Sequence, residues 1–286
     1  MNINNIITEI EKVDPEVYER LDTRRNAMRQ FAGIGGKIAL TAVPILFGGM
    51  LKKAYGQTNS GTMKIIDVLN FALTLEYLES EFYIRGVASE GLIPAGRDTK
   101  SITIIRDHEI EHVAFLKTAI KSLGGTPVSK PSFDFTAGNG SHNGPFRGVF
   151  INYTIFLQLA QTFEDTGVRA YKGQAANLMS NNDVLTYALD IHSVEARHAS
   201  HIRTMRRGMT NDRSIKSWIT GRQTGAIGDA VQANYDGEEN TIQGGVEITH
   251  INGYPIDRDA ATESFDEPLT KQEILKLVNP FIVPQS

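Results

Sequence analysis

The chain of 286 residues carries 29 basic and 33 acidic side chains, a formal net charge of −4, and no cysteine. This charge balance provides no cationic field for a phosphate backbone, so we expect no nucleic-acid partner. Without cysteine, disulfides, thiolate catalysis and iron–sulfur clusters are excluded, and histidine and carboxylates are the only strong metal ligands. The longest apolar run, Ile38–Leu51, is shorter than the roughly 20 residues of a membrane span, so no stable span is expected.

Residues 1–57 have the layout of an export leader. A basic segment beginning at Thr23-Arg24-Arg25 precedes an apolar, glycine-rich stretch, Phe31–Leu51, and small residues follow near a cleavage point. The segment resembles a twin-arginine signal, with Ala27 and Met28 in place of the more usual Phe-Leu pair. We therefore expect export, to the periplasm or beyond. The alternative is an amphipathic helix that stays attached, which would leave the protein in the cytoplasm.

Four long segments show the apolar period of helices, at residues 63–87, 102–123, 148–171 and 182–207. We interpret Gly86, Gly173 and Gly208 as signals of helix ends, and Ser180-Asn181-Asn182 as N-cap candidates. Two short links predict antiparallel hairpins, and the link Gly124–Pro145, about 20 residues, is long enough to cross a bundle. Residues 62–208 are therefore predicted to form an all-α, antiparallel four-helix bundle, made of two hairpins joined by a long crossover.

Residues 209–286 are predicted to form an irregular C-terminal extension. The β-like run Gly245–Ile251 suggests a short β-hairpin, and Pro268–Val278 has the pattern of a short amphipathic helix. No catalytic motif occurs in this segment. We expect it to cover the bundle or to form a contact between copies in a homo-oligomer.

Each predicted helix has an inward apolar stripe that polar residues interrupt at one depth. On the third helix the stripe begins at Phe150. The first and third helices place one glutamate at that depth, and the second and fourth each place a Glu-x-x-His pair: Glu76, Glu164, Glu109 with His112, and Glu195 with His198. The glutamates of the first and third helices are 88 residues apart. The glutamates of the two Glu-x-x-His pairs are 86 residues apart, and so are their histidines. This internal repeat predicts a pseudo-twofold axis through the site.

Four glutamates buried in one layer would repel one another unless cations lay among them. No lysine or arginine lies on the stripes at that depth. We therefore expect about two divalent ions, whose charge of roughly +4 offsets the carboxylates. Carboxylates with one imidazole per ion and no sulfur favour iron or manganese, and zinc is also compatible.

This set of residues resembles the ligands of the ferritin-like di-iron and di-manganese carboxylate proteins. The phrases Leu73–Tyr83 and Phe265–Lys271 are similar to the bacterial desiccation-related ferritin-like family, whose members are often exported. The resemblance implies two iron or two manganese ions per chain. In the ferritin-like pattern Glu109 and Glu195 bridge the ions, Glu76 and Glu164 cap them, and His112 and His198 are terminal ligands.

Tyr83 and Tyr171 also resemble residues of ferritin-like sites, because each follows the single glutamate of its helix by seven residues. Two helical turns span about 10.5 Å, so neither tyrosine can reach the glutamate of its own helix. We expect each to donate a hydrogen bond to a ligand on a neighbouring helix. The alternative is a tyrosine of the core that is hydrogen-bonded elsewhere.

Several other ionisable residues lie near this layer in the sequence. Glu79 competes with Glu76 for the inward position, while we expect Glu81 and Glu111 to face solvent. His108 forms a rival pair with Glu111 but falls off the stripe. The remaining histidines are interpreted as residues of an outer helix face or of exposed loops: His192, His201, His142 and His250.

The expected function is consumption of O2 or H2O2 at the dimetal site in stress protection, as a ferroxidase or oxidase, or as a di-manganese catalase-like oxidoreductase. One alternative is iron storage in a hollow shell. Another is a non-enzymatic stress or desiccation-related protein, in which the ions only stabilise the bundle.

Overall fold

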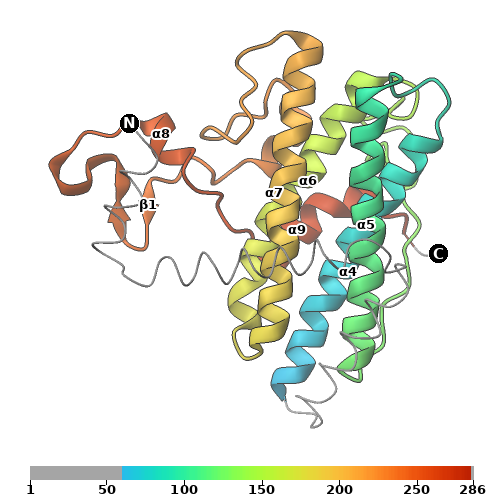
Figure 1. Cartoon of the computed structure of the whole chain (residues 1–286), viewed down its shortest axis with the longest axis horizontal. Coiled ribbons are helices and arrows are strands. Elements are labelled where there is room, and N and C mark those ends of the chain that lie inside the picture. The colour runs from blue at the N-terminus through green and yellow to red at the C-terminus, as the bar shows by residue number, and fades with distance from the viewer. Residues whose placement is uncertain (1–59, 285–286) are drawn as a thin grey trace, which may run out of the picture. The chain divides into compact units, whose positions relative to one another are not determined.

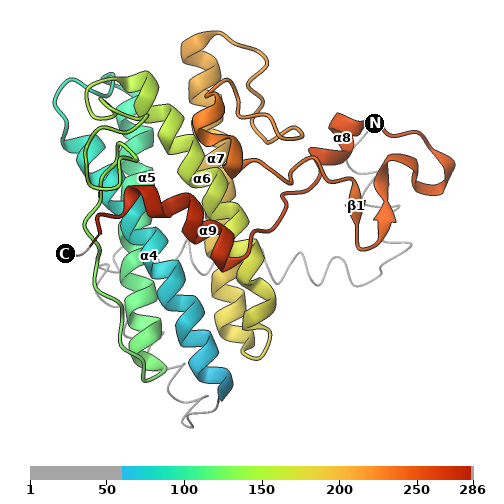
Figure 2. The same ribbon diagram turned by 180° about the vertical axis from the view of Figure 1, so that it is seen from behind.

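The computed structural model describes residues 60–284, so the predicted leader lies outside the described residues. Four long helices stand side by side (Figures 1 and 2): α4 (Ser60–Ala88), α5 (Arg97–Ser122), α6 (Tyr153–Ala175) and α7 (Asn182–Thr210). Helix α4 packs mainly against α5, and α6 against α7. The predicted bundle of two hairpins with one long crossover is thereby confirmed. Among the described helices, none has the length and apolar character required to span a bilayer.

The third helix begins five residues later than the sequence predicts, at residue 153 instead of 148. Helix α6 begins at Tyr153, because the side chain of Asn152 accepts hydrogen bonds from the backbone N–H groups of the first turn and caps the helix. Residues 148–151 form turns, so Phe150 does not belong to the helical stripe. Its ring nevertheless packs on Phe82, with the centroids 5.8 Å apart. The N-cap of α7 is Asn181, which is one of the three residues predicted as candidates.

The glycines that we interpreted as helix ends have a different role. Gly86 lies within α4, where a Cβ would overlap the ring of Phe156. Gly173 lies within α6, where a Cβ would overlap the backbone carbonyl of Leu269. Helix α7 continues past Gly208 to Thr210, and the residue that caps its end, Asn211, has a left-handed φ of 56°. Two of these glycines therefore permit close packing rather than ending a helix.

The extension after α7 is irregular, as predicted. Strands β1 (Ile242–Gln243) and β2 (Val246–Glu247) form a minimal antiparallel hairpin, whose turn consists of two glycines at positive φ. The rest of the predicted β-like run is helical: it forms the 3₁₀ helix η3 (Ile248–Gly253). Further short elements are η1 (Ala176–Leu178), η2 (Asp229–Asn234), α8 (Arg258–Thr262), α9 (Lys271–Val278) and η4 (Asn279–Phe281).

The end of the extension lies across the bundle. In Figure 2, α9 crosses α4 and α6, and its side chains Ile274 and Val278 are buried. A capping box between Thr270 and Glu273 fixes the start of α9. Beyond it, Ile282 forms an antiparallel bridge with Phe133 of the crossover. The extension thus covers the outer face of α6, and this helix is buried on most sides.

Candidate metal centre

The six predicted ligands meet in the middle of the bundle. The four glutamates are fully buried, and the two histidines are at most 8% exposed. Each of the four long helices contributes at the same depth, as the duplicated spacing predicts: Glu76 from α4, Glu109 and His112 from α5, Glu164 from α6, and Glu195 and His198 from α7.

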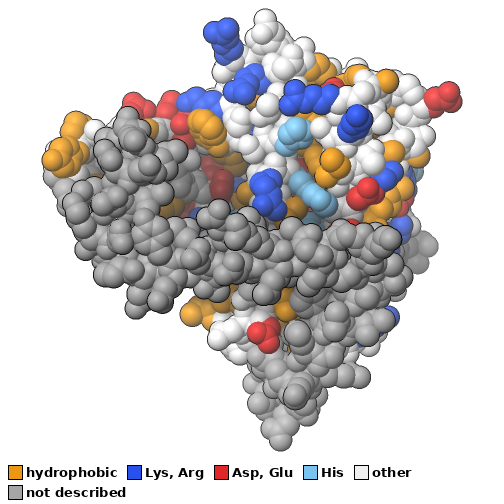
Figure 3. All heavy atoms as spheres, in the orientation of Figure 1, with side chains coloured by type: hydrophobic (Ala, Val, Ile, Leu, Met, Phe, Trp, Pro, Cys, Tyr) orange, Lys and Arg blue, Asp and Glu red, His pale blue; other side chains and the backbone are white. Residues whose placement is uncertain are grey.

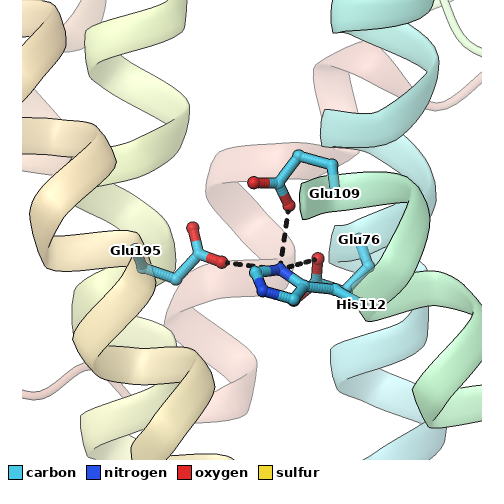
Figure 4. A group of neighbouring side chains, drawn as sticks. All are labelled: Glu76, Glu109, His112 and Glu195. Carbon is cyan, nitrogen blue, oxygen red and sulfur yellow. Dashed lines mark hydrogen bonds and ion pairs between the residues drawn. The ribbon is translucent and has the colours of Figure 1, made fainter. Parts of the chain in front are cut away.

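One group of possible ligand atoms forms around His112 (Figure 4). Its Nδ1 atom lies 3.2 Å from Glu76 Oε2, 3.2 Å from Glu109 Oε2 and 3.1 Å from Glu195 Oε1. Three carboxylates from three helices thus point at one imidazole nitrogen. Their ligand atoms all lie within 4.8 Å of one another, which is close enough to hold one metal ion.

A second group forms around His198. Its Nδ1 atom lies 2.9 Å from Glu109 Oε1 and 3.3 Å from Glu164 Oε2, and Glu195 completes the group. Glu109 and Glu195 therefore belong to both groups. A carboxylate shared between two ion positions can bridge two ions with its two oxygens, which is the arrangement that the ferritin-like pattern implies for these two residues.

Hydrogen bonds, such as those between His112 and the carboxylates of Glu76 and Glu109, account for only part of the convergence of these atoms. Among the described residues, Glu109 Oε1, Glu164 Oε2, His198 Nδ1 and both oxygens of Glu195 are buried without a hydrogen-bond partner. His198 Nδ1 and Glu109 Oε1 are close, yet the two are not aligned for a hydrogen bond. Buried polar atoms that lack a partner cost about 1–3 kcal/mol each. Metal ions at the two positions would satisfy these atoms, so the donor set fits two ions.

Without metal ions, the crowding of carboxylates shifts the pKa values of the residues in this layer. Burial raises the pKa of Glu76 to about 7, and burial together with Glu109 and Glu76 raises the pKa of Glu195 well above 4.5. Burial opposes the charge on Glu109, but the adjacent imidazoles of His112 and His198 outweigh it and lower the pKa of Glu109. Burial likewise opposes the charge on His198, yet Glu164 and Glu109 raise its pKa to about 11. The layer thus attracts protons, as it would attract other cations.

Each of the two tyrosines bonds to a glutamate of the other hairpin. Tyr83 on α4 donates a hydrogen bond to Glu164 Oε1 on α6, and Tyr171 on α6 donates one to Glu76 Oε1 on α4. These are the contacts that the seven-residue spacing predicts. Burial and the adjacent glutamates raise the pKa of both hydroxyls well above 10, so both remain protonated donors that orient the carboxylates.

Glu79 is a fifth buried glutamate, next to the four that belong to the two groups. Burial, followed by Glu195 and Glu76, raises its pKa well above 4.5. It belongs to neither group of ligand atoms, so the structure places Glu76, the preferred alternative, at the centre. Room for this extra carboxylate comes from Gly167, where a Cβ would lie 3.2 Å from Glu79 Oε1 and 3.3 Å from Glu195 Oε2.

Sequence reasoning missed the contact that His108 makes. Its Nδ1 lies 2.9 Å from His198 Nε2, the ring nitrogen that faces away from the carboxylates, and the two rings stack at 5.2 Å. His108 is half-buried, and in Figure 3 histidine side chains reach the surface between α5 and α7. The only sequence signal was its position next to Glu109 and one turn before His112.

The other residues weighed from the sequence lie away from the two groups. Glu111 is exposed, and Glu81 forms ion pairs with Arg85 and Lys130 near the surface. The remaining histidines are half-buried on α7 or exposed in the irregular segments: His192, His201, His142 and His250.

Replacing His108 is expected to weaken one ion position and not the other. A partner on the far nitrogen of a ligating histidine fixes its ring, and losing such a partner costs about 10- to 100-fold in metal affinity. Calorimetric titration of His108→Ala with Mn(II) should therefore show one weakened and one unchanged binding step. His201→Ala, which changes a half-buried histidine outside both groups, is the matched control. Equal weakening of both steps would contradict the expectation.

A comparison with protein families matches residues 64–207 to the ferritin-like domain. The matched segment is just over half of the chain and contains every residue of the two groups. The similarity to the narrower desiccation-related family stays a prediction. A search of the curated proteins finds no match.

Proposed function

The chain belongs to the ferritin-like domain family, and we propose that it binds two iron or manganese ions and uses them to consume O2 or H2O2. The observation that carries the proposal is the convergence of four buried glutamates and two histidines, five of whose buried atoms lack a hydrogen-bond partner among the described residues. The sharing of Glu109 and Glu195 between the groups supports a pair of ions rather than a single one.

The chemistry follows from the donor set. Two Fe(II) ions supply two electrons, which with two protons reduce one O2 to H2O2, or one H2O2 to two water molecules. The residues of the chain hold the ions, exclude bulk water from a layer that is almost fully buried, and orient the carboxylates through Tyr83 and Tyr171. With manganese, the same ligands would suit dismutation of H2O2 to O2 and water, the catalase-like alternative.

The proposal is tested by anaerobic loading with Fe(II). We expect about two ions per chain, and the near-ultraviolet absorption of ferric iron after O2 is admitted. The double variant Glu109→Gln/Glu195→Gln, which keeps the shape of both shared side chains, should bind neither ion tightly. Glu111→Gln, at an exposed position of α5, is the control and should behave like the wild type. Unchanged binding in the double variant would refute the assignment.

Turnover separates an enzyme from a metal-stabilised structural protein. If the ions only stabilise the bundle, chelation lowers the melting temperature and the loaded protein shows no reaction with O2 or H2O2. Storage of iron in a shell would instead require a large closed assembly on a sizing column. The export that residues 1–57 predict is part of the proposal and would be tested by fractionation of the native host.

A further inference from the structure

An apolar cavity lies in the core of the bundle beside the group around His112. Three of its lining residues stand four positions along a helix from a proposed ligand: Ala72, Leu116 and Ile191. Residues four apart share a helix face, so these side chains form the next layer of the core. Tyr171 also lines the cavity, and its hydroxyl bonds to Glu76. The cavity therefore borders the proposed metal centre.

The cavity suits a small apolar molecule. It leaves about 20 Å³ for the centre of a water-sized sphere, and about 10–15 Å³ is enough for one water. Its walls are mostly aliphatic and aromatic. Two polar groups of the walls are already engaged, the Tyr171 hydroxyl by Glu76 and the Gln174 amide oxygen by Asn177, and the Tyr187 hydroxyl belongs to the half-buried end of the lining. A water or peroxide molecule would lose hydrogen bonds by entering, whereas an apolar gas would not.

The cavity approaches the surface between α5 and α7. Phe115 on α5 and Tyr187 on α7 are the half-buried members of the lining, while its other members are buried. Their rings meet edge to face, with the centroids 5.3 Å apart. A small molecule that passes this pair of rings reaches the cavity without crossing a polar layer.

Comparison of the two halves of the internal repeat indicates that the bundle can form without a cavity at these positions. At the offset of 88 residues, three lining positions correspond to phenylalanines in the other half: Val68 to Phe156, Leu75 to Phe163, and Ala170 to Phe82. These phenylalanine rings pack on one another, with Phe82 centred 4.7 Å from Phe156 and 5.2 Å from Phe163. The same bundle positions thus hold large rings beside Tyr83 and smaller side chains beside Tyr171.

We propose that this cavity binds dioxygen and delivers it to the His112 side of the metal centre, which makes O2 rather than H2O2 the oxidant. The choice of oxidant rests on the proposed function. The binding of an apolar gas rests only on the size, walls and position of the cavity.

Xenon, an apolar gas that occupies dry cavities, tests the binding on the full chain without metal. We expect one xenon site in crystals pressurised with the gas, between Tyr171 and the Phe115–Tyr187 pair, and a xenon-dependent shift of the NMR signals of the lining methyl groups. Val68→Phe and Ala188→Ile introduce the residues found at the corresponding positions of the other half, Phe156 and Ile102. Both should abolish xenon binding, whereas Ala114→Ile at an exposed position of α5 should not. Absence of xenon from the wild-type cavity overturns the proposal.

Oxidation kinetics test the delivery. Ala188→Ile, the milder filling change, should still bind two irons, with oxidation by O2 slowed by about 10-fold, which corresponds to about 1.4 kcal/mol in the activation free energy, and oxidation by H2O2 unchanged. Circular dichroism and cooperative thermal unfolding establish that the variant is folded; if Val68→Phe does not fold, Ala188→Ile carries the test alone. Equal slowing with both oxidants, or with neither, overturns the proposal. A wild-type chain that binds xenon but no iron refutes the proposed function and not the gas site.

Discussion

Glu195→Gln is expected to stabilise the metal-free protein and to abolish its stabilisation by metal. Both carboxylate oxygens of Glu195 are buried without a hydrogen-bond partner among the described residues, and burial raises its pKa. The amide keeps the shape and removes one charge, so the free energy of unfolding without metal at about pH 8 should rise by about 2 kcal/mol. Metal at a hundred times its Kd stabilises the wild type by about 3 kcal/mol, and the variant should lose this gain.

The stability of the metal-free protein should also depend on pH, which tests the same expectation in a second way. Acids with raised pKa values, such as Glu76 at about 7, destabilise the folded chain as pH rises from 4.5 through their folded pKa. The stabilising charge on His198 is complete below 6.5 and is lost as pH rises toward about 11. The lowered pKa of Glu109 makes the stability depend on pH only below about pH 4.5. The metal-free protein should therefore lose stability from about pH 5 to about pH 8, with a shallower slope in Glu195→Gln.

Urea unfolding with and without Mn(II), at several pH values, measures both effects. Glu111→Gln removes the same charge from an exposed position of α5 and should change neither the stability nor the response to metal. A Glu195→Gln protein that is less stable than the wild type without metal would show that hydrogen bonds, and not ions, hold this layer together.

The inner face of the bundle could be predicted from the sequence because its signals are local and repeated. A helix of known period fixes which residues share a face, and the duplicated spacing selects Glu76 and Glu164 from several acids. The bonds of Tyr83 and Tyr171 follow from the same geometry, since two helical turns separate each tyrosine from its own glutamate. The contact of His108 with His198 depends on how closely α5 approaches α7, which no spacing within one helix encodes.

The outer face of α6 could not be predicted, because its partners lie far along the chain in segments without a period. Asp165 directly follows Glu164, yet it is buried against Arg203 and accepts a hydrogen bond from Tyr235 of the extension. Gly173 appears in the sequence as a helix end, but it makes room for the backbone of Leu269. A glycine in a helical pattern has either meaning, and only the path of the extension distinguishes them.

Arg169→Ala is expected to detach the extension from α6 and to destabilise the protein strongly. The buried guanidinium donates to the backbone carbonyls of Asn234, Asp236 and Glu267, and it forms an ion pair with Glu238 at 2.7 Å. Alanine would leave a buried carboxylate and three carbonyls without their donor. Removing one partner of a buried ion pair costs about 3–5 kcal/mol, so the midpoint of urea unfolding should fall sharply.

Limited proteolysis distinguishes local detachment from global unfolding. Since Arg169 contacts the extension and none of the proposed ligands, cleavage within residues 211–268 should accelerate before cleavage in the bundle, and the variant should still bind two metal ions. Arg169→Lys keeps the charge but lacks the planar fork that reaches three carbonyls, so it should restore only part of the stability. Arg207→Ala, at an exposed position of α7, is the control. A loss below about 1 kcal/mol in Arg169→Ala, the range of exposed ion pairs, would mean that α9 and the bridge from Ile282 to Phe133 hold the extension without this arginine.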